Sequence, residues 1–162
     1  MKRALPFIVL LLLVIGCRPA EKTSLPTDGA TLMDAAKQEP MNAFVSIFEI
    51  PVTDIERATE FYRQVLAIEL EEFTAPGMQM GIFPVENQMN VGVLLKAEDY
   101  VPSSNGVTIY FNAGDDLQIV LDRVEPSGGQ ILVPKTPHAD DSGFFALFLD
   151  TEGNRLGLHS PE

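Results

Sequence analysis

Hydrophobic and polar positions along the chain follow a pattern that occurs twice. In the first copy, alternation over residues 44–50 leads through an acidic turn into apolar residues at helical spacing over residues 55–66. In the second, alternation over residues 107–111 leads through a similar turn into a helical stripe over residues 117–124. The copies are offset by roughly 60 residues, and a repeated unit of this kind cannot bury its apolar faces alone. The sequence therefore predicts two related units that share one sheet system and one cavity, and that bury one core.

Each unit is predicted to contain one helix and four strands. Asp54 is placed as the N-cap of the first helix, with Arg57 three residues on within reach of it. Turn residues at Pro76-Gly77, Glu86-Asn87 and 150–154 separate the later strands. The expected strands are 44–50, 68–73, 79–84 and 90–95 in the first unit, and 107–111, 130–134, 144–150 and 156–159 in the second.

The N-terminal residues have the pattern of an export signal. A positive start at Lys2 and Arg3 precedes an apolar run that ends at Ile15, shorter than the ~20 residues needed to span a bilayer. Gly16 directly before Cys17, the only cysteine, resembles a bacterial lipobox. We expect residues 1–16 to be removed and Cys17 to carry lipid. An ordinary signal peptide with an incidental cysteine is the alternative.

The signal predicts a cellular address. Residues 17–40, rich in proline, threonine and serine, are expected to form a flexible tether, in which Thr31–Gln38 could make a short helix. The domain is then residues 41–162. A lipid on Cys17 anchors the chain to a membrane on its extracytoplasmic side. Arg18 after the cysteine favours the outer membrane in a bacterium that has two.

The charge of the chain limits its partners. It carries 23 acidic and 11 basic side chains, a formal charge of −12. Nucleic acid is therefore not expected as a partner, and neither is an anionic membrane surface. The single cysteine leaves no intrachain disulfide. Nothing in the sequence decides against a homodimer.

Three short motifs resemble the vicinal oxygen chelate superfamily, which includes glyoxalase I, fosfomycin- and bleomycin-resistance proteins and extradiol dioxygenases. The resemblance covers residues 41–160. The motifs are Pro51-Val52-Thr53-Asp54 with Ala58 and Phe61-Tyr62, Asp115-Asp116-Leu117 with Val124-Glu125 and Gly128-Gly129, and Phe148-Leu149-Asp150-Thr151-Glu152-Gly153-Asn154. It implies an α+β fold of two βαβββ modules, in which a curled mixed sheet surrounds one cavity.

Catalytic members of that superfamily hold a divalent metal through inward-facing His and Glu side chains. Carried over one at a time, the ligand positions fall on Ile47, Thr108 and Gly157, and the fourth within residues 91–95. None of these side chains holds a divalent cation as histidine or carboxylate would. The resemblance thus implies the fold of the family without its metal, and we expect no cofactor.

Other polar residues are expected to line the cavity mouth, on the strand faces of the missing ligands or directly after a strand. They are Glu49, Thr108, Tyr110, Asn112, Lys135 and His159. The alternative is that they are polar groups at strand ends with no ligand. His138 is expected in a solvated acidic loop, where it could also help to close the cavity.

Two functions remain open from the sequence. The first is a metal-free binding module that takes a small molecule in its cavity. The second is an enzyme, a glyoxalase-like lyase or isomerase or a dioxygenase-related protein, with Glu49 or His159 as general base. The fold alone does not decide between them. The missing metal ligands favour binding.

Overall fold

The computed structural model describes residues 45–85 and 91–162, all within the unit Met41–Glu162. The predicted signal, Cys17 and the tether lie outside these residues, as does the predicted turn at Glu86-Asn87. Among the described residues, no helix is long and apolar enough to cross a membrane.

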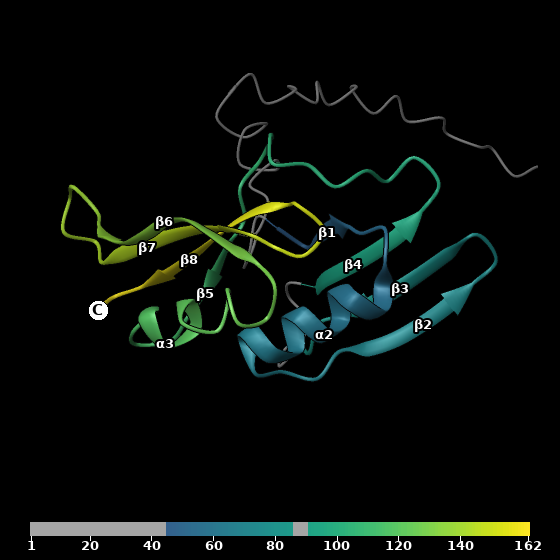
Figure 1. Cartoon of the computed structure of the whole chain (residues 1–162), viewed down its shortest axis with the longest axis horizontal. Coiled ribbons are helices and arrows are strands. Elements are labelled where there is room, and N and C mark those ends of the chain that lie inside the picture. Colours follow the sequence, from purple (N-terminus) through teal and green to yellow (C-terminus); the bar gives the residue numbers. More distant parts are fainter. Residues whose placement is uncertain (1–44, 86–90) are drawn as a thin grey trace, which may run out of the picture. The chain divides into compact units, whose positions relative to one another are not determined.

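The two expected modules are present (Figure 1). The first consists of β1 (Ile47–Pro51), α2 (Ile55–Leu66), β2 (Glu71–Ala75), β3 (Met78–Ile82) and β4 (Val91–Ala97). The second consists of β5 (Tyr110–Asn112), α3 (Gln118–Leu121), β6 (Gln130–Pro137), β7 (Phe144–Leu149) and β8 (Arg155–Ser160). Each module therefore has the element order βαβββ.

Each module builds its own four-stranded mixed sheet. The strand order is β1-β4-β3-β2 in the first sheet and β5-β8-β7-β6 in the second. The first strand of each module pairs in parallel with the last, whereas the other pairs are antiparallel. The repeated topology confirms the predicted α+β class of two βαβββ modules.

Helix α2 follows the prediction. Asp54 caps it by accepting a hydrogen bond from the backbone N–H of Arg57 at 3.1 Å, and Ala67 ends it in the left-handed conformation. Its buried face is the predicted stripe, except that Thr59 is buried as well and Leu66 is only half-buried. The aromatic side chains of this stripe lead into the core.

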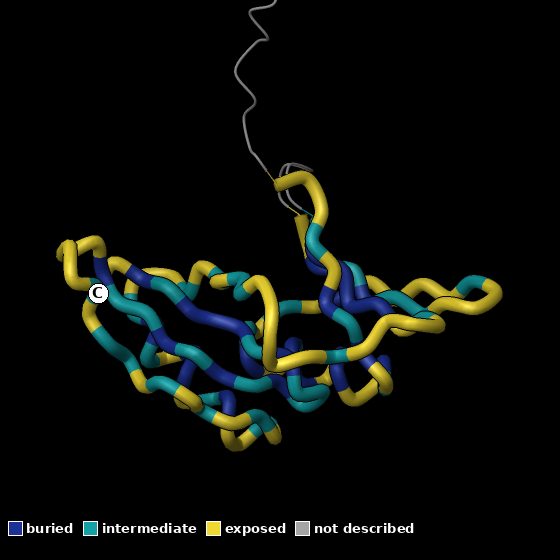
Figure 2. Tube along the Cα trace, turned by 90° about the horizontal axis from the view of Figure 1, so that it is seen from above, coloured by how far each residue is buried: buried dark blue, intermediate teal, exposed yellow. Residues whose placement is uncertain are grey.

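The core is shared by both modules. The ring of Phe61 lies 6.2 Å from that of Phe148, and the ring of Tyr62 lies 6.0 Å from that of Phe111, measured between centroids. Buried residues of α2, β4, α3, β7 and β8 belong to one cluster. Figure 2 shows the burial along the trace, with exposed residues at the hairpin ends. This confirms the prediction that the two units bury one core.

The second helix is shorter than predicted. The stripe over residues 117–124 is buried at Leu117, Val120, Leu121 and Val124, but α3 itself spans only Gln118–Leu121. Turns take over from residue 122 up to the glycines at 128 and 129. The β-branched residues Ile119, Val120 and Val124 lower the helix propensity of this segment. The apolar side chains of the stripe are therefore buried by a single helical turn followed by a tight loop.

Several strand boundaries also differ from the prediction. Strand β2 begins three residues later than expected, because it pairs with β3 around the two-residue turn at Pro76-Gly77, where Gly77 has a φ of 82°. Strand β5 has only three residues, and Val107, predicted to begin it, is 93% exposed. Strand β6 is longer than predicted and continues through Pro134 to Pro137.

The hairpin between β7 and β8 joins the modules. The side chain of Glu152 is fully buried and accepts hydrogen bonds from Thr53 N at 2.8 Å and from Nε of Arg57 at 2.8 Å. Asn154 donates through Nδ2 to the carbonyl of Pro51 at 2.8 Å. This hairpin of the second module thereby holds the segment between β1 and α2 of the first.

Candidate functional site

Two of the predicted ligand positions, Ile47 and Gly157, lie on sheet faces turned away from the core. Their strand neighbours Phe48 and Leu158 pack in or against the core, and successive residues of a strand point to opposite faces. Residues paired across neighbouring strands point to the same side. Ile47 and Glu49 pair with Val91 and Val93, and all four share one face of the first sheet. Tyr110 pairs with Gly157 in the second sheet. We call these two surfaces the open faces.

The open faces do not offer a metal site at the inherited positions. Ile47 is aliphatic and 62% exposed, and the hydroxyl of Thr108 accepts a hydrogen bond from Nε of Arg155 at 3.2 Å. A Cβ built on Gly157 would overlap the ring of Tyr110, so an aromatic ring covers the third position. In the described part of the chain, no group of three or more His, Cys, Asp or Glu residues is placed to hold a metal. The residues present do not fit a divalent cation.

The open face of the second sheet carries an aromatic cluster instead. The ring of His138 lies 4.9 Å from that of Phe145 and 5.5 Å from that of His159, measured between centroids. Phe145 is paired with His159 across β7 and β8, next to the Tyr110–Gly157 pair. We call His138, Phe145, His159 and Tyr110 the aromatic face. Both histidines of the chain belong to it.

His138 reaches this face because β6 is longer than predicted. The backbone N–H of His138 donates to the carbonyl of Gly143 at 2.8 Å, which continues the β6–β7 hairpin one residue beyond Pro137. The ring of His138 therefore lies next to the rings of Phe145 and His159 on the open face of the second sheet. The sequence signal for this was weak, since two prolines in the segment indicated the end of the strand.

Asn112 belongs to the same open face, at its edge. It pairs with His159 across β5 and β8. Its Oδ1 accepts a hydrogen bond from the backbone N–H of Gly114 at 3.0 Å, which orders the loop after β5. The structure thus places Tyr110, Asn112 and His159 on one face of the second sheet.

Glu49 lies apart from that group, on the first sheet. Its Oε2 accepts a hydrogen bond from the hydroxyl of Tyr100 at 2.8 Å, and this hydrogen bond raises the pKa of Tyr100. A pocket of about 140 Å³ is lined by Glu49, Arg155 and the connection between the modules. Of the six predicted residues, Glu49 alone lines it.

Lys135 lies on the other side of the second sheet. Its Nζ is 2.7 Å from Oδ1 of Asp116 and 4.6 Å from the ring centroid of Phe144, which packs against the core. The hydrogen bond from Lys135, together with one from the backbone of Gln118, lowers the pKa of Asp116. The structure therefore does not unite all six predicted residues in one pocket.

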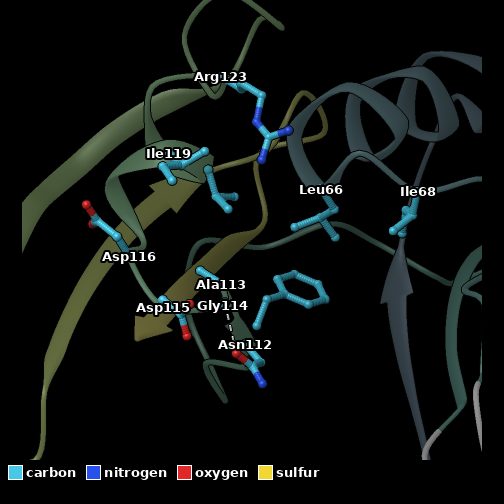
Figure 3. Close-up of a pocket in the computed structure, with 11 residues that line it drawn as sticks. Leu66, Ile68, Asn112, Ala113, Gly114, Asp115, Asp116, Ile119 and Arg123 are labelled. Atoms are coloured by element: carbon cyan, nitrogen blue, oxygen red, sulfur yellow. Dashed lines mark hydrogen bonds between the residues drawn. The ribbon is translucent and has the colours of Figure 1, made fainter. Parts of the chain in front are cut away.

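A larger pocket than the one beside Glu49 lies elsewhere, between the end of α2 and α3 (Figure 3). Its volume is about 500 Å³, within the range of small-molecule sites. Its walls are mainly apolar, and it is lined by Leu66, Ile68, Phe111, Asn112, Ala113, Gly114, Asp115, Asp116, Ile119, Val120 and Arg123. Only Asn112 among the predicted residues borders it. We call it the interhelical pocket.

These features define a class. The chain is an α+β protein in which two βαβββ modules, each with its own mixed sheet, share one core. The model of the glyoxalase/bleomycin resistance protein/dioxygenase superfamily matches residues 44–158. The chain belongs to this superfamily, which confirms the resemblance of its motifs.

Individual relatives agree with this assignment. A glyoxylase-like domain-containing protein of Didymella fabae is 36% identical over 126 residues, which cover 68% of this chain and 88% of that protein. TnmS3, an antibiotic binding protein from Streptomyces sp. CB03234, has a TM-score of 0.60 at 21% identity, covering 76% of this chain and all of that one.

A mutant of glyoxalase I from Zea mays has a TM-score of 0.57 at 19% identity. The match covers 71% of this chain and 45% of that one, so the chain spans less than half the length of the maize enzyme. At these identities the solved structures show a common fold.

Proposed function

We propose that this chain is a lipid-anchored extracytoplasmic domain that binds a small aromatic molecule on its aromatic face, without a metal. The observation that carries the proposal is that glycine stands at residue 157, where the family's metal ligand would be. Where a metal ligand of the family would point inward, the ring of Tyr110 covers the backbone. The open face of the second sheet, which would carry the metal ligand in a catalytic member of the family, is therefore aromatic in this chain.

The chemistry of this face suits a planar apolar ligand. Aromatic side chains bury a large area and pair with other rings in offset or edge-to-face geometry. Tyr110 is 46% exposed, and Phe145 and His159 are half-buried. The fold relative from Streptomyces is an antibiotic binding protein, which supports binding as a use of this fold. Asn112 and the histidine nitrogens supply polar groups at the edge of the face.

Proton NMR tests this directly, because the chain has only two histidines and both lie on the aromatic face. We expect 2-naphthol, added to the full chain, to shift the imidazole signals of His138 and His159 by ring currents. Gly157→Ala displaces the Tyr110 ring. In this variant the same shifts should require at least a tenfold higher concentration of 2-naphthol. The control, Ile119→Ala, alters an exposed residue of the interhelical pocket and should leave them unchanged.

Two results contradict the proposal. One is the absence of any histidine shift at millimolar 2-naphthol, and the other is an equal shift in Gly157→Ala. Conversion of the hemithioacetal of methylglyoxal and glutathione by the purified chain would instead support the enzyme alternative. That activity should then fall on replacing His159 or Glu49, the two residues named as candidate bases.

A further inference from the structure

The interhelical pocket contains an arginine whose charge is not paired. Among residues 45–85 and 91–162, the side chain of Arg123 forms no hydrogen bond and no ion pair, and its Nε is buried without a partner. In Figure 3 the side chain extends from the loop after α3 toward Leu66 at the end of α2. A charged donor that is removed from water without a partner is destabilising, and an anion in the pocket supplies the missing acceptor.

The remainder of the pocket is apolar near Arg123. Leu66 and Ile68 come from the end of α2 and the segment after it, whereas Ile119 and Val120 belong to α3. Val120 is buried and Ile119 is 66% exposed, so the apolar surface runs from the interior to the rim. Burial of a ligand's hydrocarbon against these side chains is favourable because it removes apolar surface from water.

The opposite end of the pocket is acidic. Asp115 and Asp116 lie at the loop before α3, on another side of the pocket from Arg123 (Figure 3). Asp116 is paired with Lys135, whereas the carboxylate of Asp115 forms no ion pair within the described residues. A ligand with several negative charges would be repelled here, and the chain as a whole carries −12. A single anionic group at the Arg123 end is the charge that fits.

We propose that the interhelical pocket binds an amphipathic monocarboxylate, an apolar molecule with one carboxylate that pairs with the guanidinium of Arg123. The planar guanidinium matches a carboxylate through two parallel N–H···O bonds. The hydrocarbon lies between the end of α2 and α3, so the ligand touches both modules. This site is distinct from the aromatic face, because its lining includes neither histidine and not Tyr110, although Asn112 borders both.

Calorimetry with three eight-carbon probes tests the ligand class on the full chain. We expect octanoate to bind. We expect 1-octanol, used below its solubility limit, and octyl phosphate, used below its micellar concentration, to bind at least tenfold more weakly. Arg123→Gln should weaken octanoate about ten- to hundredfold, as expected for a charge-assisted hydrogen bond, while Arg123→Lys should weaken it less. The matched control is Arg63→Gln, an arginine on α2 that is paired with Glu60 and Glu69 outside the pocket.

A second variant guards against misfolding at Arg123. Ile119→Glu adds a carboxylate at an exposed rim position, where it should fold normally and weaken octanoate through repulsion. Octanoate should also leave the imidazole signals of His138 and His159 unshifted. Equal affinity for octanoate and 1-octanol, or octanoate binding that is unchanged in both Arg123→Gln and Ile119→Glu, would overturn the proposal.

Discussion

The hydroxyl of Tyr62 donates a hydrogen bond to Oδ2 of Asp150 at 2.6 Å, although 88 residues separate the two in the chain. Tyr62 lies on the buried face of α2 in the first module, and Asp150 directly follows β7 in the second. The same carboxylate accepts hydrogen bonds from the backbone of Glu152 and Asn154. Burial and the charge of Asp150 both raise the pKa of Tyr62, so the phenol stays protonated. One buried carboxylate thus ties the α2 helix to the turn that clamps its N-terminus.

Tyr62→Phe tests the strength of this link. The change leaves the ring in place but removes a donor to a buried carboxylate, so the unfolding free energy should fall by about 1–3 kcal/mol. Urea denaturation followed by circular dichroism measures it. Tyr100→Phe is the matched control, since it removes a hydroxyl that bonds to Glu49 at the exposed surface. That variant should change stability by less than about 0.5 kcal/mol. Equal effects of the two changes would contradict a special role for Tyr62.

Glu152 should make stability depend on pH. Burial opposes its ionisation, but hydrogen bonds from Arg57 and Thr53 outweigh burial and lower the pKa of Glu152 below the ordinary value of 4.5. A carboxyl with a lowered pKa in the folded state stabilises above its unfolded pKa, and this contribution is lost as the pH falls through the folded value. The unfolding free energy should therefore decrease as the solution is acidified below about pH 4.5.

Glu152→Gln should flatten that decrease and lower stability at neutral pH. Urea titrations at several pH values between about pH 3 and pH 7 measure both effects. The control is Glu56→Gln on the exposed side of α2, which should leave the slope unchanged. If the unfolding free energy of Glu152→Gln fell with acidification as steeply as that of the unaltered chain, the carboxyl of Glu152 would not be the source of the pH dependence.

The shared core predicts that Phe61 is indispensable for stability. Its side chain is 1% exposed and contacts the rings of Tyr62 and Phe148, one in each module. Phe61→Ala should cost ~3–5 kcal/mol as a large-to-small change in a core. A loss below about 1 kcal/mol falls far outside that range. For the same reason, neither module expressed alone should show a cooperative unfolding transition.

Local features of the fold were predictable from the sequence, and long-range ones were not. The bounds of α2, its cap at Asp54 and its buried stripe follow from residues within a few positions of one another. The partner of Arg57 was predicted to be Asp54, three residues away, but the closer partner is Glu152 at 2.8 Å, against 3.8 Å. Pairing across the modules depends on how the two units dock, which no local pattern contains.

The candidate site shows the same division. Strand alternation correctly placed Tyr110, Asn112 and His159 on one face, since alternation is a local property. His138 was missed as a member because Pro134 indicated the end of β6, whereas irregular pairing near Val133 lets the strand continue. The interhelical pocket was missed entirely, because it exists only where the end of α2 meets α3.

The proposed anchor is tested at Cys17, which lies outside the described residues. If a lipid on this cysteine holds the chain to the membrane, Cys17→Ser should release the domain into the soluble fraction of cells. Several acyl chains contribute ~0.8 kcal/mol per buried CH₂, so their loss is decisive for partitioning. Mass spectrometry of the native chain should also show that residues 1–16 are absent. Membrane retention of Cys17→Ser would reject the lipoprotein interpretation.

The last prediction concerns metal. The full chain, purified without chelator, should contain no stoichiometric Zn²⁺, Ni²⁺, Mn²⁺ or Fe²⁺, measured by inductively coupled plasma mass spectrometry. The physical reason is the donor set: the inherited positions carry Ile47, Thr108 and Gly157, and the ring of Tyr110 covers the last of them. Loss of supporting residues alone typically weakens metal binding roughly 10–100-fold, so loss of the ligands themselves should leave only weak surface binding. His138 and His159 lie close enough to act as two donors, and two are too few for a tetrahedral site. One equivalent of tightly held metal that disappears in His159→Ala or Glu49→Ala would overturn this prediction and restore the enzyme alternative.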